Sequence, residues 1–284
     1  MMVYLAGLFD ANRILVAAHR PAPVQVSFHN GCTTGLEQMD YWLTDALIHP
    51  TEGSRERFTE TLYRLPIFYN YPPISGAPDI GPLPADDNGF ITFGSFNNLC
   101  KITPDVIRLW SSILRALPTA RLQLKYRDQL GNPVLQKQIL ARFKRHGIRK
   151  NRIDLISALE DFNTHLARYN TIDIALDPFP FTGATTTFQA LWMGVPVVTL
   201  LGDRFIGRMA GDILFHAGLH ACLAESSDDY QQQALDLADD LEQLRTRRVE
   251  LRAGLAASAL CDGAGYAKGI ERAYLDMWGR CVVA

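Results

Sequence analysis

Residues 172–201 read IDIALDPFPFTGATTTFQALWMGVPVVTLL, and this stretch decides the fold. Two short apolar runs, residues 172–176 and 195–201, favour β-strands, and residues 185–194 between them have the composition of a helix. A strand, a helix and a second strand in this order are typical of a βαβ unit, whose two strands lie parallel. The sequence therefore predicts a parallel sheet covered by helices.

The same alternation extends toward both ends of the chain. Thr103 and Pro104 predict the start of a helix, as an N-cap residue and a proline at the first helical position, and Pro118 predicts its end. Further strands are expected at residues 91–96, 121–126 and 152–156, and further helices at residues 133–147, 161–170 and 205–217 and beyond Asp228, the last being 267–278. This order predicts an α/β fold with a doubly wound, Rossmann-like lobe over about residues 90–225. Ligands bind such sheets beyond the carboxyl ends of the strands.

The composition of the 284 residues excludes several classes of protein. Hydrophobic residues make up 48 % of the chain and charged residues 20 %, which is unlike a disordered chain. The 28 Lys and Arg and the 30 Asp and Glu give a net charge of −2, so nucleic acid is not an expected partner. The chain has no run of about 18 apolar residues and no signal-peptide pattern at its start. We therefore expect a cytoplasmic location and no membrane partner.

Cysteine and histidine spacing gives no sign of a metal site. The chain contains no CxxC pair, so neither a disulfide framework nor a structural zinc site is expected, and the thiols should be reduced and mostly buried. The histidines show no HExxH motif and no paired spacing, so the sequence predicts no metal. The five cysteines are Cys32, Cys100, Cys222, Cys261 and Cys281.

A proline-rich stretch from Pro72 to Pro84 precedes the polar residues Asp86, Asp87 and Asn88. This composition is typical of a loop or linker. It predicts a lobe boundary that divides the chain into residues 1–88 and 89–284.

Two segments that follow expected strands are candidates for phosphate binding. Lys101 lies after the strand at 91–96 and before a helix N-terminus, where its ammonium suits a phosphate; the alternative is a solvated loop lysine. After the strand at 172–176, Gly183 is followed by three threonines at a helix start, which suit a diphosphate; the alternative is an ordinary capped helix. Neither a Walker A motif nor GxGxxG is present, so a nicotinamide cofactor is not expected. His165, in the helix at 161–170, belongs to the same edge and suits contact with a base, unless it is an ordinary surface histidine.

Several segments together resemble the O-GlcNAc transferase/SPINDLY family, glycosyltransferase family 41. The block DPFPFTGATTT (177–187) with ALWMGVPVVT (190–199) is the most distinctive of them. The likeness covers about residues 5 to 280. The other segments that carry it are RPAPVQ (20–25), TTG (33–35), MDY (39–41), TD (44–45), FNNLCKI (96–102), and Tyr274, Met277 and Trp278 of the closing helix.

The resemblance implies an inverting, metal-independent glycosyltransferase of the two-lobed GT-B class, with no cofactor. The donor would be UDP-GlcNAc or a related nucleotide sugar, and the acceptors would be Ser and Thr hydroxyls of proteins. Residues 1–88 would be part of the N-terminal, acceptor-side lobe. Residues 89–284 would be the nucleotide-sugar-binding lobe with C-terminal helices.

The family's known residues can be carried over position by position. Lys101 falls on its diphosphate lysine, which makes Lys101 the candidate catalytic residue. His165 falls on its uracil-contacting histidine, and Thr185 and Thr186 fall on its diphosphate-binding threonines. The residues expected to bind substrate are Thr33, Thr34, Asn98, His165, Gly183, Ala184, Thr185, Thr186, Thr187 and Gln189.

The sequence also departs from the family. Ala184 stands where the family often has His or Gly, Gln189 where it has an acid, and Asn98 where it often has Gln. Residues 29–35, HNGCTTG, are one residue shorter than the family's loop near the sugar.

The chain begins inside the first lobe, so we expect a fragment or a truncated gene product. An alternative is an inactive module that binds a uridine nucleotide. Another GT-B enzyme, such as a nucleotide-sugar epimerase, is disfavoured because the segments at 20–25 and 185–199 occur together.

Overall fold

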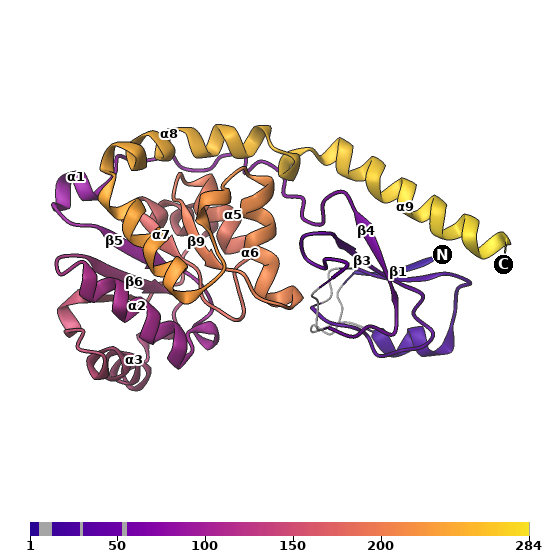
Figure 1. The fold of residues 1–284 in the computed structure, drawn as a ribbon, viewed down its shortest axis with the longest axis horizontal. Helices are drawn as coiled ribbons and strands as arrows, with labels where there is room; N and C mark the ends of the chain where they lie inside the picture. The colour runs from indigo at the N-terminus through magenta and orange to yellow at the C-terminus, as the bar shows by residue number, and fades with distance from the viewer. Residues whose placement is uncertain (6–12, 29–30, 53–55, 284) are drawn as a thin grey trace.

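Two parallel sheets organise the chain (Figure 1). The structure is a computed structural model, and it describes residues 1–5, 13–28, 31–52 and 56–283. The larger sheet and its helices form one lobe, and the smaller sheet forms the other. The helix α8 (Leu241–Ala257) lies over the first lobe, and α9 (Gly263–Val283) continues over the second.

The larger sheet has the strand order β10-β9-β8-β5-β6-β7, and all of its neighbouring strands are parallel. From β5 the chain moves outward to β7, and it then returns to the other side of β5 with β8. This is the doubly wound Rossmann arrangement, and the strand order reverses between β5 and β8. The strands are β5 (Thr92–Ser95), β6 (Arg121–Lys125), β7 (Ile153–Ile156), β8 (Ile174–Leu176), β9 (Val197–Leu200) and β10 (Leu223–Ala224).

Helices cover this sheet in two groups. In the first group, α2 packs against α3 and α7. In the second group, α5 packs against α6 and α8. The start of α2 is the predicted one, because the side chain of Thr103 accepts a hydrogen bond from the backbone N–H of Val106. The helices are α2 (Pro104–Ala116), α3 (Pro133–Arg145), α4 (Phe162–Ala167), α5 (Thr185–Trp192), α6 (Phe205–His216) and α7 (Ser227–Asp239).

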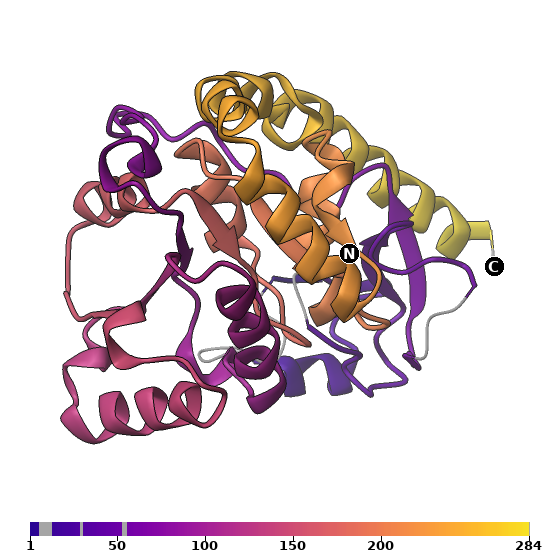
Figure 2. The ribbon, with the colours of Figure 1, turned by 60° about the vertical axis from the view of Figure 1, so that its left-hand side comes forward.

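The smaller sheet has the order β1-β2-β3-β4, again all parallel. Its strands are β1 (Met2–Tyr4), β2 (Gln25–Ser27), β3 (Tyr41–Asp45) and β4 (Thr61–Leu65). The helix α9 packs against β4, and Figure 2 shows it alongside this sheet. The connecting 3-10 helices are η1 (Ile14–His19), η2 (Leu99–Lys101), η3 (Gln129–Gly131), η4 (Lys150–Arg152), η5 (Arg168–Thr171), η6 (His220–Cys222) and η7 (Ala259–Cys261).

The two lobes are joined by hydrogen bonds at the start of α6. The backbone N–H of Phe205 donates to Oε2 of Glu56 at 2.7 Å. A second hydrogen bond lies in the same region: Nε of Arg208, on α6, donates to the carbonyl oxygen of Leu47 at 2.6 Å. These bonds fix α6 against the loop that follows β3.

The Rossmann-like lobe confirms the predicted α/β fold, with small differences at element ends. The strand β10 was not predicted, because it is two residues long and carries no pattern of its own. Asp86, Asp87 and Asn88 are also not a loop, which corrects the interpretation of that segment. They belong to the short helix α1 (Pro84–Asn88), which has Pro84 in its first turn and ends at Gly89 in the left-handed conformation, with φ 71°.

Along the sequence, the strands of the smaller sheet precede this helix and those of the larger sheet follow it, while the boundary at residue 88 itself stays a prediction. Among the described residues, no helix combines the length and apolar character needed to cross a membrane.

Candidate functional site

The carboxyl ends of β5, β6, β7 and β8 surround a cavity of about 640 Å³ at the point where the strand order reverses. Each strand is followed by a residue of its lining: Phe96 after β5, Tyr126 after β6, Glu160 after β7 and Thr185 after β8. The volume is typical of a site for a small organic ligand. The other lining residues are Lys125, Arg127, Ala158, Leu159, Phe162, His165, Thr186 and Gln189.

Lys101 ends η2 and contacts the loop between β8 and α5. Its Nζ donates to the carbonyl oxygen of Thr182 at 2.7 Å and lies 3.4 Å from Oδ1 of Asn97. The same ammonium lies 4.1 Å from the centre of the Phe181 ring. Burial lowers the pKa of Lys101, while the charge of Asp177 raises it. Lys101 therefore joins the loops that follow β5 and β8.

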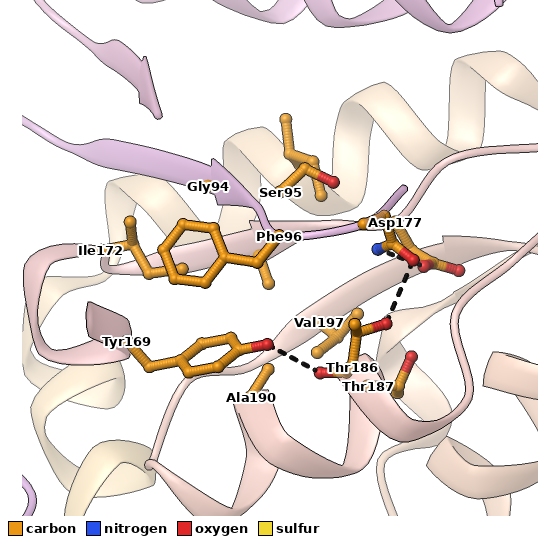
Figure 3. Close-up of a pocket in the computed structure, with 13 residues that line it drawn as sticks. Gly94, Ser95, Phe96, Tyr169, Ile172, Asp177, Thr186, Thr187, Ala190 and Val197 are labelled. Carbon is orange, nitrogen blue, oxygen red and sulfur yellow. Dashed lines mark hydrogen bonds between the residues drawn. The ribbon is translucent and has the colours of Figure 1, made fainter. Parts of the chain in front are cut away.

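Asn97 connects Lys101 to the first turn of α5. Its Oδ1 accepts a hydrogen bond from Oγ1 of Thr186 at 3.1 Å, and its Nδ2 lies 3.4 Å from Oδ1 of Asp177. Figure 3 shows Tyr169 on the other side of Thr186, where its hydroxyl donates to the Thr186 carbonyl oxygen at 3.3 Å. One hydrogen-bond network therefore holds side chains from three separate segments.

Asp177 is a buried carboxylate that orders the loop at 178–184. Its Oδ1 accepts from the backbone N–H of Gly183, and its Oδ2 accepts from Oγ1 of Thr199, both at 2.8 Å. Burial raises the pKa of Asp177 to about 7, although the hydrogen bonds from Thr199 and Gly183 and the charge of Lys101 lower it. Asp177 therefore sets the position of Gly183, directly before α5.

Gly183 has no room for a side chain. A Cβ atom added there would lie 2.6 Å from Oγ1 of Thr187, 2.7 Å from Oγ1 of Thr186 and 2.8 Å from Oδ1 of Asp177. The close approach of these three oxygens therefore requires glycine at this position.

The three threonines that begin α5 have different surroundings. Thr185 is exposed, Thr186 is half-buried, and both line the cavity. Thr187 is only 2 % exposed, so its hydroxyl lies in the interior. The N-cap residue Ala184 supplies no side-chain hydrogen bond, so the first backbone N–H groups of α5 are open to a ligand.

His165 on α4 also lines the cavity, in a row of polar side chains with Lys125 and Gln189. Its Nδ1 lies 3.1 Å from Nζ of Lys125, and its Nε2 lies 3.3 Å from Oε1 of Gln189. An ammonium group only donates, so Nδ1 accepts and the proton of the neutral ring is on Nε2. Burial, followed by the charge of Lys125, lowers the pKa of His165. Lys125 also lies 3.3 Å from Glu160, which pairs with Arg168 at 2.6 Å.

The structure brings most of the predicted residues to this edge of the sheet. Asn98 caps η2, because its Oδ1 accepts a hydrogen bond from the backbone N–H of Cys100 at 3.2 Å. Ala184 and Gln189 lie at the N-cap and on the inner face of α5, respectively.

Thr33 and Thr34 lie in the other lobe, and both are bound to Glu60. Oγ1 of Thr33 donates to Oε2 of Glu60 at 2.6 Å, and the backbone N–H of Thr34 donates to Oε1 at the same distance. A Cβ at Gly31 would lie 3.8 Å from Ile206, whose carbonyl oxygen accepts from the N–H of Thr182. Gly31 therefore lies beside the residue of α6 that is hydrogen-bonded to the loop that Lys101 contacts. His29 and Asn30 of the same expected loop lie outside the described residues.

Sequence reasoning missed three residues of the site: Asn97, Asp177 and Lys125. An acid directly after the buried run at 174–176 was a signal for Asp177, since a carboxylate at such a position is costly unless it is hydrogen-bonded. Asn97 and Lys125 carried no comparable signal, because their partners are distant in sequence.

This arrangement suits a nucleoside diphosphate. The ammonium of Lys101, the hydroxyl of Thr186 and the start of α5 provide positive charge and donors for phosphate oxygens. The cavity between them and His165 has room for a nucleoside.

The fold of the chain is that of GT-B glycosyltransferases. A trehalose-6-phosphate synthase, OtsA, superposes with a TM-score of 0.54 over 92 % of this chain and 69 % of its own, and at 13 % identity this likeness concerns the fold alone. More specifically, the chain belongs to glycosyl transferase family 41, whose model matches residues 82–270. The resemblance inferred from the sequence is thereby confirmed.

Relatives match almost the whole chain. It is 40 % identical over 282 residues to the probable UDP-N-acetylglucosamine–peptide N-acetylglucosaminyltransferase SPINDLY of Oryza sativa subsp. japonica, and 39 % identical over 280 residues to that of Arabidopsis thaliana. These matches cover 99 % and 98 % of this chain but 30 % of each relative. A mutant of the Thermobaculum terrenum O-GlcNAc transferase superposes with a TM-score of 0.90 at 38 % identity, over 99 % of this chain and 53 % of that one.

Proposed function

We propose that this chain provides the donor-binding part of a glycosyltransferase that transfers GlcNAc or a related sugar from a UDP-sugar to Ser and Thr hydroxyls of proteins. The observation that carries the proposal is the meeting of Lys101, Thr186 and the open start of α5 beside a cavity that His165 also lines. The names of the relatives support a UDP-GlcNAc donor and a peptide acceptor.

The diphosphate would bind between Lys101 and the first turn of α5. As the bond between sugar and phosphate breaks, negative charge develops on the departing UDP. The ammonium of Lys101, the hydroxyls of Thr185 and Thr186 and the helix dipole would stabilise that charge. This is the function that a metal ion serves in other transferases, so we propose transfer without a metal or other cofactor.

The base would bind beside His165 in the same cavity. His165 presents an N–H group at Nε2, which currently lies beside Gln189, and this donor suits a carbonyl oxygen on the edge of uracil. The acceptor would approach from the lobe of Thr33 and Thr34, because Gly31 of that lobe lies beside the residue of α6 that is hydrogen-bonded to the loop at 178–184.

We also propose that the protein acts in the cytoplasm. The support is that all five cysteines are free thiols. Three of them are exposed, which corrects the expectation that most are buried. Free exposed thiols are typical of a reducing compartment.

Calorimetry with UDP, ADP and GDP tests the donor assignment. We expect the chain to bind UDP more tightly than the other two nucleotides, in the presence of EDTA as well as of Mg²⁺. Equal affinities for the three would overturn the uridine assignment, and binding that requires Mg²⁺ would overturn metal independence.

Transfer is tested by supplying UDP-GlcNAc and peptide acceptors and by following the acceptor mass. Transfer by the parent chain, and its loss in Lys101→Ala, would support the glycosyltransferase assignment. UDP binding without any transfer, both by this chain and by a longer form spanning the matched length of its relatives, would identify the inactive binding module instead.

A further inference from the structure

Three potential metal ligands meet between the two lobes: Asp45 at the end of β3, and Asp212 and His216 on α6. Their ligand atoms all lie within 4.8 Å of one another. Asp212 and His216 are four residues apart, so they share one face of the helix. None of the three lines the cavity beside Lys101.

Asp45 is held in place by three backbone N–H groups. Its Oδ1 accepts hydrogen bonds from the backbone N–H groups of Leu47 and Ile48 at 2.9 and 2.8 Å, and its Oδ2 accepts from Phe68 at 2.8 Å. An oxygen that accepts one hydrogen bond keeps a lone pair, so Oδ2 can still bind a cation.

Asp212 is 1 % exposed, and its carboxylate lies beside the imidazole of His216. Within the described part of the chain, no donor forms a hydrogen bond to either carboxylate oxygen of Asp212. Nε2 of His216 also has no hydrogen-bond partner there, and it lies 3.4 Å from Oδ1 of Asp212. Among the described ion pairs, no Lys or Arg is paired with Asp45 or Asp212. Two buried carboxylates whose described ion pair is with a histidine alone are unfavourable unless a further positive charge or a proton compensates them.

We propose that Asp45, Asp212 and His216 bind a divalent transition-metal ion, with Zn²⁺ as the best fit, and that this ion joins β3 to α6. Aspartate oxygen and histidine nitrogen are both ligands of Zn²⁺, and three protein ligands with one water complete a tetrahedron. Mg²⁺ and Ca²⁺ prefer sites made of oxygen ligands alone.

The geometry needs only small movements to close around the ion. Zinc–ligand distances of about 2.0–2.1 Å place neighbouring ligands about 3.3 Å apart. Asp212 and His216 can approach this by rotating their side chains, since neither is held by a hydrogen bond. The side chain of His216 is 17 % exposed, which gives the ion a route from solvent.

Zinc binding is measured on a chain in which Cys32, Cys100 and Cys281 are replaced by Ser, because these exposed thiols would otherwise bind Zn²⁺. The chain is freed of metal and titrated with Zn²⁺ in competition with a chromophoric chelator, without nucleotide. We expect one Zn²⁺ per chain. At a hundredfold excess over Kd, the Tm should rise by about 5 °C, because the ion binds the folded state alone.

Asp212→Asn and His216→Gln should each abolish this zinc-dependent rise in Tm. Asp212→Asn should still fold without metal, because it removes the buried charge and keeps the shape of the side chain. The matched controls are Asp236→Asn, on the exposed face of α7, and His146→Gln, at the end of α3, and both should keep the response. An unchanged Tm of the parent chain with Zn²⁺, or an equal rise in Asp212→Asn, would overturn the proposal and indicate that a proton neutralises Asp212 instead.

Discussion

The Nζ atom of Lys101 and the carbonyl oxygen of Thr182 are 2.7 Å apart, although the two residues follow different strands and are 81 positions apart in the chain. This hydrogen bond joins the loop after β5 to the loop after β8 at the point where the strand order reverses. The ammonium therefore lies beside the start of α5 before any phosphate arrives. A group that is already positioned loses little further freedom when it binds a ligand.

Lys101→Ala should weaken the binding of UDP far more than that of uridine, because the ammonium contacts phosphate and not the base. A charge-assisted hydrogen bond contributes about 1.5–3 kcal/mol, which corresponds to about a tenfold to hundredfold loss of affinity for UDP. Calorimetry with UDP and uridine measures both. Lys137→Ala, on the exposed surface of α3, is the matched control and should leave both affinities unchanged. An equal loss for UDP and uridine would contradict the assigned contact.

The sequence predicts those parts of the molecule whose information is local. The element β8, the loop after it and α5 follow from one stretch of apolar periodicity and a glycine before three threonines. The start of α2 follows from Thr103 and Pro104. In contrast, β10 has two residues, and its pairing with β9 depends on the completed sheet.

The contacts that complete the site are not local, and this is why they were missed. Asn97 and Asp177 are 80 positions apart, and Lys125 and His165 are 40 positions apart. Periodicity and spacing contain no information about such pairs. The cluster of Asp45 with Asp212 and His216 is a further example, because its two helical members have a recognisable spacing but the third comes from the other lobe.

Gly183→Ala should destabilise the chain and weaken UDP binding together. The added methyl group would meet three oxygen atoms at 2.6–2.8 Å, so the loop at 178–184 must shift. Forcing an extra methyl group into a packed site costs about 1–3 kcal/mol. Urea unfolding measures the loss of stability, and calorimetry measures the loss of UDP affinity.

Gly254→Ala is the matched control for this change. Gly254 lies within α8, and a Cβ there would have no neighbour within 4 Å. Alanine is the better helix former, so this variant should be more stable than the parent by about 0.5–1 kcal/mol. If Gly183→Ala behaved like Gly254→Ala, the crowding of Gly183 would be refuted.

Lys125→Met should raise the pKa of His165. Burial is the first cause of the lowered pKa and would remain, but the second cause, the positive charge of Lys125, would be gone. The pKa of the imidazole can be followed by NMR titration in both proteins, with Lys137→Met as a control that should leave it unchanged. A pKa of His165 that did not rise in Lys125→Met would show that the lysine does not set the charge of the ring.

The same shift makes stability depend on pH in a defined direction. The unfolded chain, in which His165 has its ordinary pKa, binds a proton more readily than the folded chain in the window between the lowered pKa and 6.5. The contribution of His165 to stability is therefore complete above pH 6.5 and decreases as the pH falls through that window. Urea unfolding at several pH values should show a smaller decrease in Lys125→Met than in the parent.

Asp177 should have the opposite effect, and Asp177→Asn tests it. Burial raises the pKa of Asp177 to about 7 in the folded chain, against an ordinary value of 3.8. Between these two values the folded chain holds a proton that the unfolded chain has lost. The free energy of unfolding therefore decreases as the pH rises through this window, by at most about 1.4 kcal/mol per pH unit for one group.

Asparagine does not titrate, so Asp177→Asn should have a flatter dependence of stability on pH between about pH 4 and pH 7. The quantity to compare is the slope, because the substitution also changes the hydrogen bonds to Gly183 and Thr199 and so shifts stability at every pH. The exposed Asp236→Asn on α7 is the control and should keep the slope of the parent. Parallel slopes for Asp177→Asn and the parent would mean that Asp177 is ionised in the folded chain at all of these pH values. Its hydrogen bonds from Gly183, Thr199 and Asn97, together with the nearby Lys101, would then outweigh the cost of burying its charge.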